Sequence, residues 1–454
     1  MREGSLGAPV RHPLDWQNPD FYDEAKLDAE MRRVFDICHG CRRCFNLCDS
    51  FPRLFDLVDQ AGDAELHGVP SDAFKGVVDA CTLCDLCFMT KCPYVPPHEW
   101  ALDFPHLMVR HRAVEAKKNG VPFALKQLTQ TDRNGALARP VAAIANWASA
   151  ETNSLTRPLL EQVAGVHRDA HLPRFTGKTL TMRAKAEPLA LNRDAPAFGK
   201  RKAVLYATCS GNYNTPSIGM AARAILARNG VESEVVYPGC CGMPQLEQGD
   251  LARVDGKAAT VATALAPWID QGYDVIALVP SCALMLKLEW PLIAPKGAPH
   301  RAAVEKLAQA TYDVSEYIVD IARKEGLAPG LEPLPGGVAL HIACHARAQN
   351  IGQKAAEMLR LIPKADLKVI ERCSGHGGSW GVLTENFPLA LKVGKPVAAQ
   401  ALASGKRFVA SECPIAGPHI MQGIERLADP EAPAPALENL HPVELFARAY
   451  GIAV

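Results

Sequence analysis

The chain has 454 residues, 48% of them hydrophobic, and its 49 Lys and Arg balance its 49 Asp and Glu. That length allows two to four domains with buried cores, and the lack of any apolar run of about eighteen residues argues against a spanning helix. Because the start of the chain has no apolar signal core, we expect a cytoplasmic protein whose fifteen cysteines bind metal rather than form disulfides.

The balanced total hides an uneven distribution of charge. Residues 1–110 hold 11 Lys and Arg against 18 Asp and Glu, a formal charge of −7, whereas residues 111–200 hold 14 against 7, a charge of +7. An acidic module beside a basic segment suits charge-steered docking of partner proteins. Packing of the two segments against each other is an equal alternative. We expect no nucleic-acid partner.

Residues 1–20, with three prolines, predict an extended lead-in, and apolar residues at helical spacing predict a helix over 20–37. This helix leads into a run of cysteines at 38, 41, 44 and 48. After a segment over 49–80 that we interpret as helical, a second run follows at 81, 84, 87 and 92. Such a run, with two residues between successive cysteines and a fourth cysteine further on, is the bacterial ferredoxin pattern for a [4Fe–4S] cluster.

Two such runs predict two [4Fe–4S] clusters. In two-cluster ferredoxins the fourth cysteine of each run binds the other cluster. We therefore expect a first N-terminal set of Cys38, Cys41, Cys44 and Cys92, and a second N-terminal set of Cys81, Cys84, Cys87 and Cys48. A zinc ribbon, which needs two pairs of ligands, fits this spacing poorly. Arg42 and Arg43 would either offset the negative charge of the first cluster or form a solvated surface pair.

The segment from 111 to 200 contains no cysteine. Helices are predicted over 107–118 and 137–150, and prolines at 173, 188 and 196 mark a linker. The stretch 137–150 is apolar nearly all round. We interpret it as part of a buried helix pair, in preference to a shallow contact with a membrane or a partner.

From residue 201 the chain carries an internal repeat. In the first copy, strands over 203–207, 233–237 and 275–279 alternate with helices over 219–229 and 254–269. In the second, strands over 337–343, 367–370 and 408–410 alternate with a helix that ends near 361 and one over 390–403. The cysteine steps also match, at 31 and 42 residues in the first copy and 29 and 40 in the second. Each copy predicts a parallel α/β layer with cysteines at the carboxyl ends of its strands.

These strand ends predict two further sites. The first repeat set, Cys209, Cys240, Cys241 and Cys282, has four thiols, enough for a third iron–sulfur cluster or for zinc. The second repeat set, Cys344, Cys373 and Cys413, has Ser374 in place of the vicinal cysteine and His376 nearby. Three thiolates and an imidazole suit zinc or a cluster with an unusual ligand, and a site that has lost its metal is equally open.

Taken together, the two cysteine runs, Gly239-Cys240-Cys241-Gly242 and the segments that begin at Cys344, Glu371 and Cys413 resemble a known family. They are similar to the cysteine-rich subunit of anaerobic glycerol-3-phosphate dehydrogenase, to the glycolate oxidase iron–sulfur subunit and to heterodisulfide reductase subunits. The resemblance implies an all-α ferredoxin-like domain with two clusters, followed by two tandem Rossmann-like α/β domains of the cysteine-rich CCG type. In heterodisulfide reductases each CCG domain ends in a cysteine pair, and here Met285 and Ala416 stand where the last cysteine of each pair would be.

On this basis we expect an α+β multidomain chain, divided into a ferredoxin domain (1–110), a basic connector (111–200) and two CCG domains (201–330 and 331–454). The resemblance implies an iron–sulfur oxidoreductase subunit that relays electrons between a flavoprotein dehydrogenase subunit and an acceptor such as quinone or a rubrerythrin-like protein. The protein would be cytoplasmic or peripheral on the inner membrane surface. A heterodisulfide or thiol reductase and a zinc-stabilised interaction scaffold are the alternatives. The chain has no glycine-rich nucleotide fingerprint, so hydride chemistry would belong to a partner.

Overall fold

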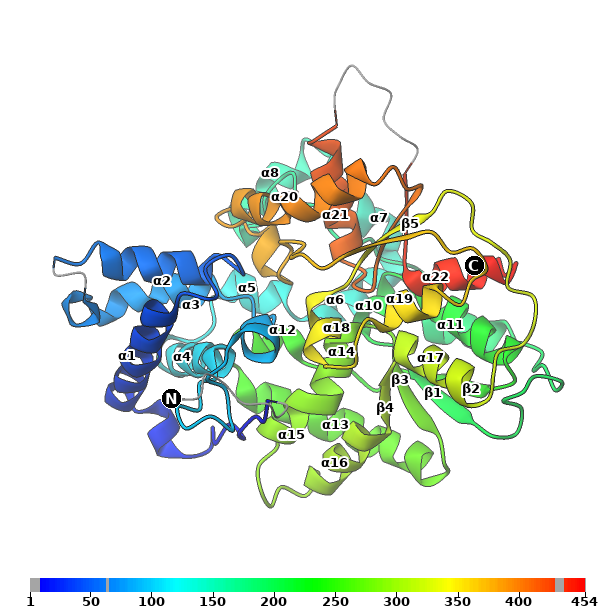
Figure 1. Cartoon of the computed structure of the whole chain (residues 1–454), viewed down its shortest axis with the longest axis horizontal. Coiled ribbons are helices and arrows are strands. Elements are labelled where there is room, and N and C mark those ends of the chain that lie inside the picture. Colours follow the sequence, from blue (N-terminus) through cyan, green and yellow to red (C-terminus); the bar gives the residue numbers. More distant parts are fainter. Residues whose placement is uncertain (1–8, 63–64, 429–436, 454) are drawn as a thin grey trace.

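A computed structural model describes residues 9–62, 65–428 and 437–453 of the chain (Figure 1). The parts of the expected lead-in and of the 49–80 segment that fall on residues 1–8 and 63–64 lie outside the described residues. The described part of residues 9–119 contains helices and no strand. Its elements are η1 (Pro19–Tyr22), α1 (Glu24–Cys41), α2 (Ser50–Asp59), η2 (Leu66–Gly68), η3 (Ser71–Ala73), α3 (Phe74–Asp79), η4 (Cys87–Lys91) and α4 (Phe104–Asn119). Met31, Phe35, Leu54 and Met108 are buried between these helices.

A first parallel sheet follows, with the strand order β2-β1-β3-β4. Its strands are β1 (Lys202–Tyr206), β2 (Glu232–Val236), β3 (Asp274–Ala277) and β4 (Thr311–Asp313). Its helices are α10 (Cys209–Tyr213), α11 (Pro216–Arg228), α12 (Met243–Leu246), α13 (Leu251–Asp270), α14 (Pro280–Leu284), η6 (Met285–Glu289), α15 (Trp290–Ile293), α16 (Arg301–Ala310) and α17 (Val314–Lys324). Alternate residues of β1 enter two different cores, Val204 with α13 and Leu205 with α11. Both sides of this strand are therefore buried, as its continuous apolar run requires.

The second parallel sheet repeats this topology, with the order β6-β5-β7-β8. Its strands are β5 (Val338–His341), β6 (Leu367–Ile370), β7 (Phe408–Ser411) and β8 (Glu438–Leu440). Its helices are α18 (Cys344–Ala348), α19 (Lys354–Leu359), η7 (Trp380–Val382), α20 (Phe387–Ala403), α21 (Ala416–Glu425) and α22 (Pro442–Ala449). The expected fold class is confirmed. Each sheet has a fourth strand that the sequence did not reveal, because three residues are too few to leave a recognisable pattern.

The connector consists of α5 (Phe123–Leu128), α6 (Thr131–Ala138), η5 (Arg139–Val141), α7 (Ala142–Ala148), α8 (Thr156–Ala164) and α9 (Leu180–Ala186). The expectation of a buried helix over 137–150 is wrong. Leu137, Val141, Ile144 and Trp147 are between 47% and 66% exposed. The chain folds as two helices joined by a turn that contains Pro140. On α7 the half-buried positions include the small residues Ala142, Ala145 and Ala148, and the long side chains of Ile144 and Trp147 are exposed. No helix of the described ranges combines the length and the apolarity needed to cross a bilayer.

Candidate functional site

The first N-terminal cysteine set lines one cavity. Cys38 and Cys41 occupy the last turn of α1, and Arg42 caps this helix in the left-handed conformation (φ 51°), which turns the chain back toward Cys44. Cys92 follows η4 and completes the set. All four cysteines line a cavity that Phe51, Tyr94 and Leu102 also enclose.

The electrostatics of this cavity suit a cationic inorganic core. Burial raises the pKa of the Cys38 thiol well above its usual value, and the neighbouring Cys92, Cys44 and Cys41 raise it further. Burial, with help from Cys92 and Cys41, likewise raises the pKa of Cys44 to about 12. Four thiolates so close together repel one another unless positive charge lies between them, and bound iron would supply that charge. The residues therefore fit an iron–sulfur cluster.

The second N-terminal set gathers around a strained loop. Leu83 and Asp85, on either side of Cys84, have φ values of 49° and 60°. These values lie in the left-handed region, which non-glycine residues seldom adopt, so the backbone turns sharply on both sides of Cys84. Burial raises the pKa of Cys87, and the nearby Cys84, Cys81 and Cys48 raise it further. The four thiols of this set thus share one environment, and they fit a cluster for the same reason as the first set.

The first repeat set lies at the carboxyl ends of β1, β2 and β3. Hydrogen bonds to Cys240 and Cys282, together with burial, raise the pKa of Cys241, and the hydrogen bond between Cys209 and Cys240 raises that of Cys209. The Gly242 N–H donates to Cys240 Sγ at 3.4 Å. From α6, Thr131 Oγ1 lies 3.3 Å from Cys209 Sγ and 3.6 Å from Cys240 Sγ. Sequence reasoning missed Thr131, because nothing in its local pattern distinguishes it.

The second repeat set preserves the same backbone geometry. The Gly375 N–H donates to Cys373 Sγ at 3.3 Å, and Gly375 has φ 82°, against 84° for the equivalent Gly242. Burial raises the pKa of Cys344, and Cys373 and Cys413 raise it further. His376 lies against His419, with ring centroids 5.4 Å apart, and burial with the nearby His419 lowers the pKa of His376 to about 3.

The four sets form a continuous series. Cys44 raises the pKa of Cys87, which links the two N-terminal sets. Cys344 and Cys373 raise the pKa of Cys84, which links the second N-terminal set to the second repeat set. Cys282 raises the pKa of Cys413, which links the two repeat sets. The second N-terminal set is therefore close to the second repeat set, and Cys241 and Cys282 of the first repeat set belong to the same buried core as Cys81 and Cys87. Chain position alone does not reveal these neighbours.

The described residues contain no group of three or more His, Cys, Asp or Glu side chains placed around a single metal ion. None of the fifteen cysteines, all of which are described, forms a disulfide. Arg42 hydrogen-bonds Asp59, which neutralises its charge, while Arg43 lines the cavity of the first set.

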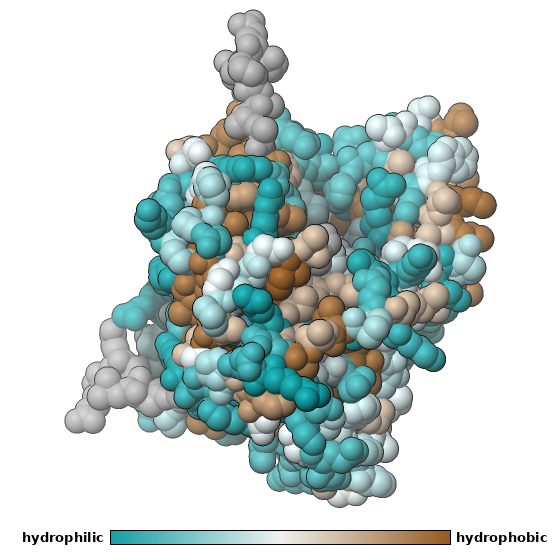
Figure 2. Space-filling view, turned by 90° about the vertical axis from the view of Figure 1, so that its right-hand side faces the viewer, coloured by the Kyte–Doolittle hydropathy of each residue, from teal (hydrophilic) through white to brown (hydrophobic). Residues whose placement is uncertain are grey.

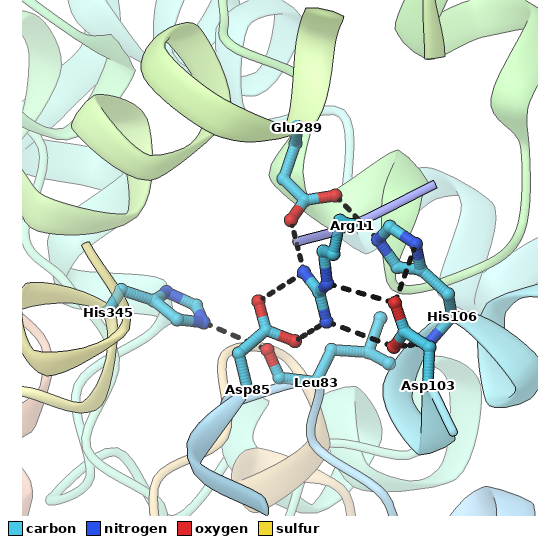
Figure 3. A network of polar contacts seen from close by, with 7 residues as sticks. All are labelled: Arg11, Leu83, Asp85, Asp103, His106, Glu289 and His345. Carbon is cyan, nitrogen blue, oxygen red and sulfur yellow. Dashed lines mark hydrogen bonds and ion pairs between the residues drawn. The ribbon is translucent and has the colours of Figure 1, made fainter. Parts of the chain in front are cut away.

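A largely buried ionic network joins the loop of the second cysteine run (81–92, here called the cluster loop) to the domain that contains the first sheet (Figure 3). Arg11, on the lead-in, donates to Asp85, Asp103 and Glu289, and His106 bridges Asp103 and Glu289. The lead-in passes between the two parts as a strap, since Val10 N–H donates to Pro96 O and Leu14 N–H to Leu292 O. His345, next to Cys344, contacts Leu83 O at 3.1 Å. These contacts hold the second N-terminal set against both repeat domains.

The model of the cysteine-rich CCG domain matches residues 203–287 and 338–416. These two segments are CCG domains. They contain both repeat sets, and the family resemblance indicated by the cysteine pattern is confirmed.

Among curated proteins, the chain is 26% identical over 291 residues to a subunit of the anaerobic glycerol-3-phosphate dehydrogenase of Escherichia coli (strain K12), a match that covers 63% of this chain and 69% of that protein. It is 28% identical to a subunit of the fumarate reductase (CoM/CoB) of Methanothermobacter marburgensis, over 48% of this chain and 41% of that protein. It is also 28% identical to lactate utilization protein A of Bacillus pumilus, over 40% of this chain and 75% of that protein.

Proposed function

We propose that this chain is an iron–sulfur electron-transfer subunit of a dehydrogenase or reductase system. Two [4Fe–4S] clusters would be held by the two N-terminal sets and a third cluster by the first repeat set. Iron–sulfur clusters exchange single electrons, and this is the chemistry that they would supply here. The names of the relatives, two of which are subunits of a dehydrogenase and a reductase, support a redox role.

The observation that carries the proposal is the unbroken series of four cysteine sets. Each set is close enough to the next for charge on one thiol to raise the pKa of another. A direct contact supports one of these steps, because His345, next to Cys344, lies 3.1 Å from the carbonyl oxygen of Leu83, next to Cys84. A chain built for thiol chemistry at one CCG site would not need three further sets in line with it.

The residues around the sets would tune and protect the bound groups. The Gly242 and Gly375 N–H groups donate to cysteine sulfurs, which favours the charged, metal-binding form of the thiol. Phe51 and Leu102 help to exclude water from the first cavity. The donor would be a flavoprotein dehydrogenase subunit, and the acceptor would be a quinone or a rubrerythrin-like protein.

Iron and acid-labile sulfide counting after anaerobic purification tests the proposal. About twelve irons are expected for three clusters, because each cluster of this kind carries four. A count of about eight would leave both CCG sites without iron, and zinc in place of iron would support the interaction scaffold instead.

A Cys241→Ser variant tests the alternative of a catalytic heterodisulfide or thiol reductase. The expected result is a loss of about four irons together with a loss of electron transfer to the acceptor. The N-terminal sets should remain reducible by dithionite. A variant that loses the iron at this site yet still transfers electrons to the physiological acceptor at the parent rate would refute the relay.

A further inference from the structure

Exposed apolar side chains are concentrated on the connector. Of the fifteen large apolar residues that are exposed in the described part of the chain, nine lie within residues 123–182. Leu137, Val141, Ile144 and Trp147 follow one another at steps of four, three and three along α6, η5 and α7, and all four are exposed. Ile144 and Trp147, three residues apart on α7, share one side of that helix. Single exposed apolar residues are ordinary, but a row of this length marks an interaction surface.

A second row adjoins the first. Leu155, the N-cap residue of α8, and Leu159 and Val163 on this helix recur at steps of four and are 59–79% exposed. The turn between α7 and α8 is tight, because Thr156 Oγ1 donates to Ala148 O and Asn153 Nδ2 donates to Trp147 O at 3.0 Å. The opposite side of α8 packs on the second CCG domain. We call these two rows the connector face.

The surroundings of the connector face are basic. Lys126, Arg139, Arg174, Lys178 and Lys185 form no ion pair with any described residue, so their charges are not neutralised locally. Arg139 Nη1 lies 3.8 Å from Met182 Sδ, and Gly177, next to Lys178, lies beside the carbonyl of Arg139. The neighbouring acids Glu151 and Glu161 are paired with His171 and Arg168.

Figure 1 shows α7 and α8 in faint teal at the back of the molecule, and in Figure 2, which turns the molecule by a quarter, brown surface gathers among teal side chains along the upper right edge. We propose that the connector face docks on the surface of an anionic lipid bilayer. Apolar rows with a tryptophan would enter the headgroup region while the surrounding lysines and arginines contact anionic lipids.

Charge favours lipid over a second copy of the chain. Residues 111–200 carry a formal charge of +7, so two connector faces brought together would repel each other. An anionic bilayer satisfies both the apolar rows and the free cations.

The inference extends the proposed function by naming the surface at which electrons leave or enter. Helix α6 begins at Thr131, in contact with Cys209 and Cys240, and its last turn carries Leu137 on the connector face. Docking would place the first repeat set one helix away from the bilayer. This role of the first repeat set rests on the proposed function, whereas docking itself does not.

Flotation of the full chain, purified anaerobically with its clusters, tests the inference. We expect it to float with vesicles of equal parts phosphatidylglycerol and phosphatidylcholine, and to stay at the bottom with phosphatidylcholine alone. An Ile144→Glu/Trp147→Glu double variant should bind the anionic vesicles at least tenfold less. The matched control Leu361→Glu, at an exposed apolar residue of the second CCG domain, should bind as the parent does.

Iron content, measured on the same samples, separates this test from that of the proposed function. A parent protein with its full iron that fails to float with anionic vesicles would overturn the docking surface alone. Equal flotation with phosphatidylcholine vesicles would overturn the role of the cations. If the parent is instead a dimer that the double variant converts to a monomer, the connector face is a contact between copies and the lipid proposal is wrong.

Discussion

Replacing Arg11 by alanine tests the network that joins the cluster loop to the first CCG domain. The Arg11 side chain is only 10% exposed and makes five hydrogen bonds to three carboxylates, at 2.7–3.2 Å. All five guanidinium N–H donors are therefore used. Although burial opposes it, the neighbouring His106 and Arg11 hold the pKa of Glu289 at about 2, so this carboxylate is charged in the folded protein.

Removal of Arg11 leaves Asp85 without its ion-pair partner and leaves His106 as the remaining ion-pair partner of the buried Glu289 and the partly buried Asp103. Removing one partner of a buried ion pair costs about 3–5 kcal/mol. Since domains are stable by about 5–15 kcal/mol, the variant should lose a large part of its free energy of unfolding. Asp85 adjoins Cys84, so we also expect the second N-terminal set to release iron at a lower urea concentration than in the parent.

Anaerobic urea unfolding, followed by tryptophan fluorescence and by iron release, measures both effects. Arg11→Lys keeps a positive charge but not the planar fork, so its loss of stability should be intermediate. The control is Lys118→Ala, which removes an exposed pair with Glu24 and should leave the unfolding midpoint unchanged. If Arg11→Ala and Lys118→Ala unfold at the same urea concentration, the network does not hold the two parts together.

Three further outcomes follow from particular residues. Burial raises the pKa of Glu247 to about 7 from an ordinary value near 4.5, so folding favours the protonated form and stability falls as the pH rises from about 4.5 to 7. Glu247→Gln should remove this loss and be more stable than the parent at pH 8. An unchanged pH profile of thermal unfolding would contradict the assignment. A Cβ at Gly375 would lie 2.0 Å from Ala390 O, so Gly375→Ala should destabilise the chain by about 2 kcal/mol or more. Gly256→Ala, in an exposed position of α13 with open space, is the control and should stabilise the chain by about 0.5–1 kcal/mol. Equal melting temperatures for these two variants would show that the turn at Gly375 tolerates a side chain. Ser374→Cys would give the second repeat set a vicinal cysteine pair with Cys373, beside the Gly375 turn that matches the turn at Gly242, and should raise the iron content of the protein. An unchanged iron and sulfide count would show that the missing thiol is not what limits metal binding at this site.

The sequence by itself determined the elements that depend on local pattern. The spacing of Cys38, Cys41 and Cys44 can be read without a fold, because a cluster loop needs its thiols two residues apart. The doubled strand and cysteine steps revealed the two CCG domains, since the apolar strands of a parallel sheet are buried on both faces and leave continuous runs. The short strands β4 and β8 left no such runs.

The tertiary structure alone decided which sites are neighbours and which surfaces stay open. Thr131 and Arg11 lie far along the chain from the cysteines and carboxylates that they contact, so no periodicity could have indicated them. An apolar helix pattern is the same for a buried helix as for one that lies on the surface, and only the packing of the connector showed Ile144 and Trp147 to be exposed. The neighbours of the second repeat set were decided in the same way, because long-range packing, and not the order of residues, brings Cys344 near Cys84.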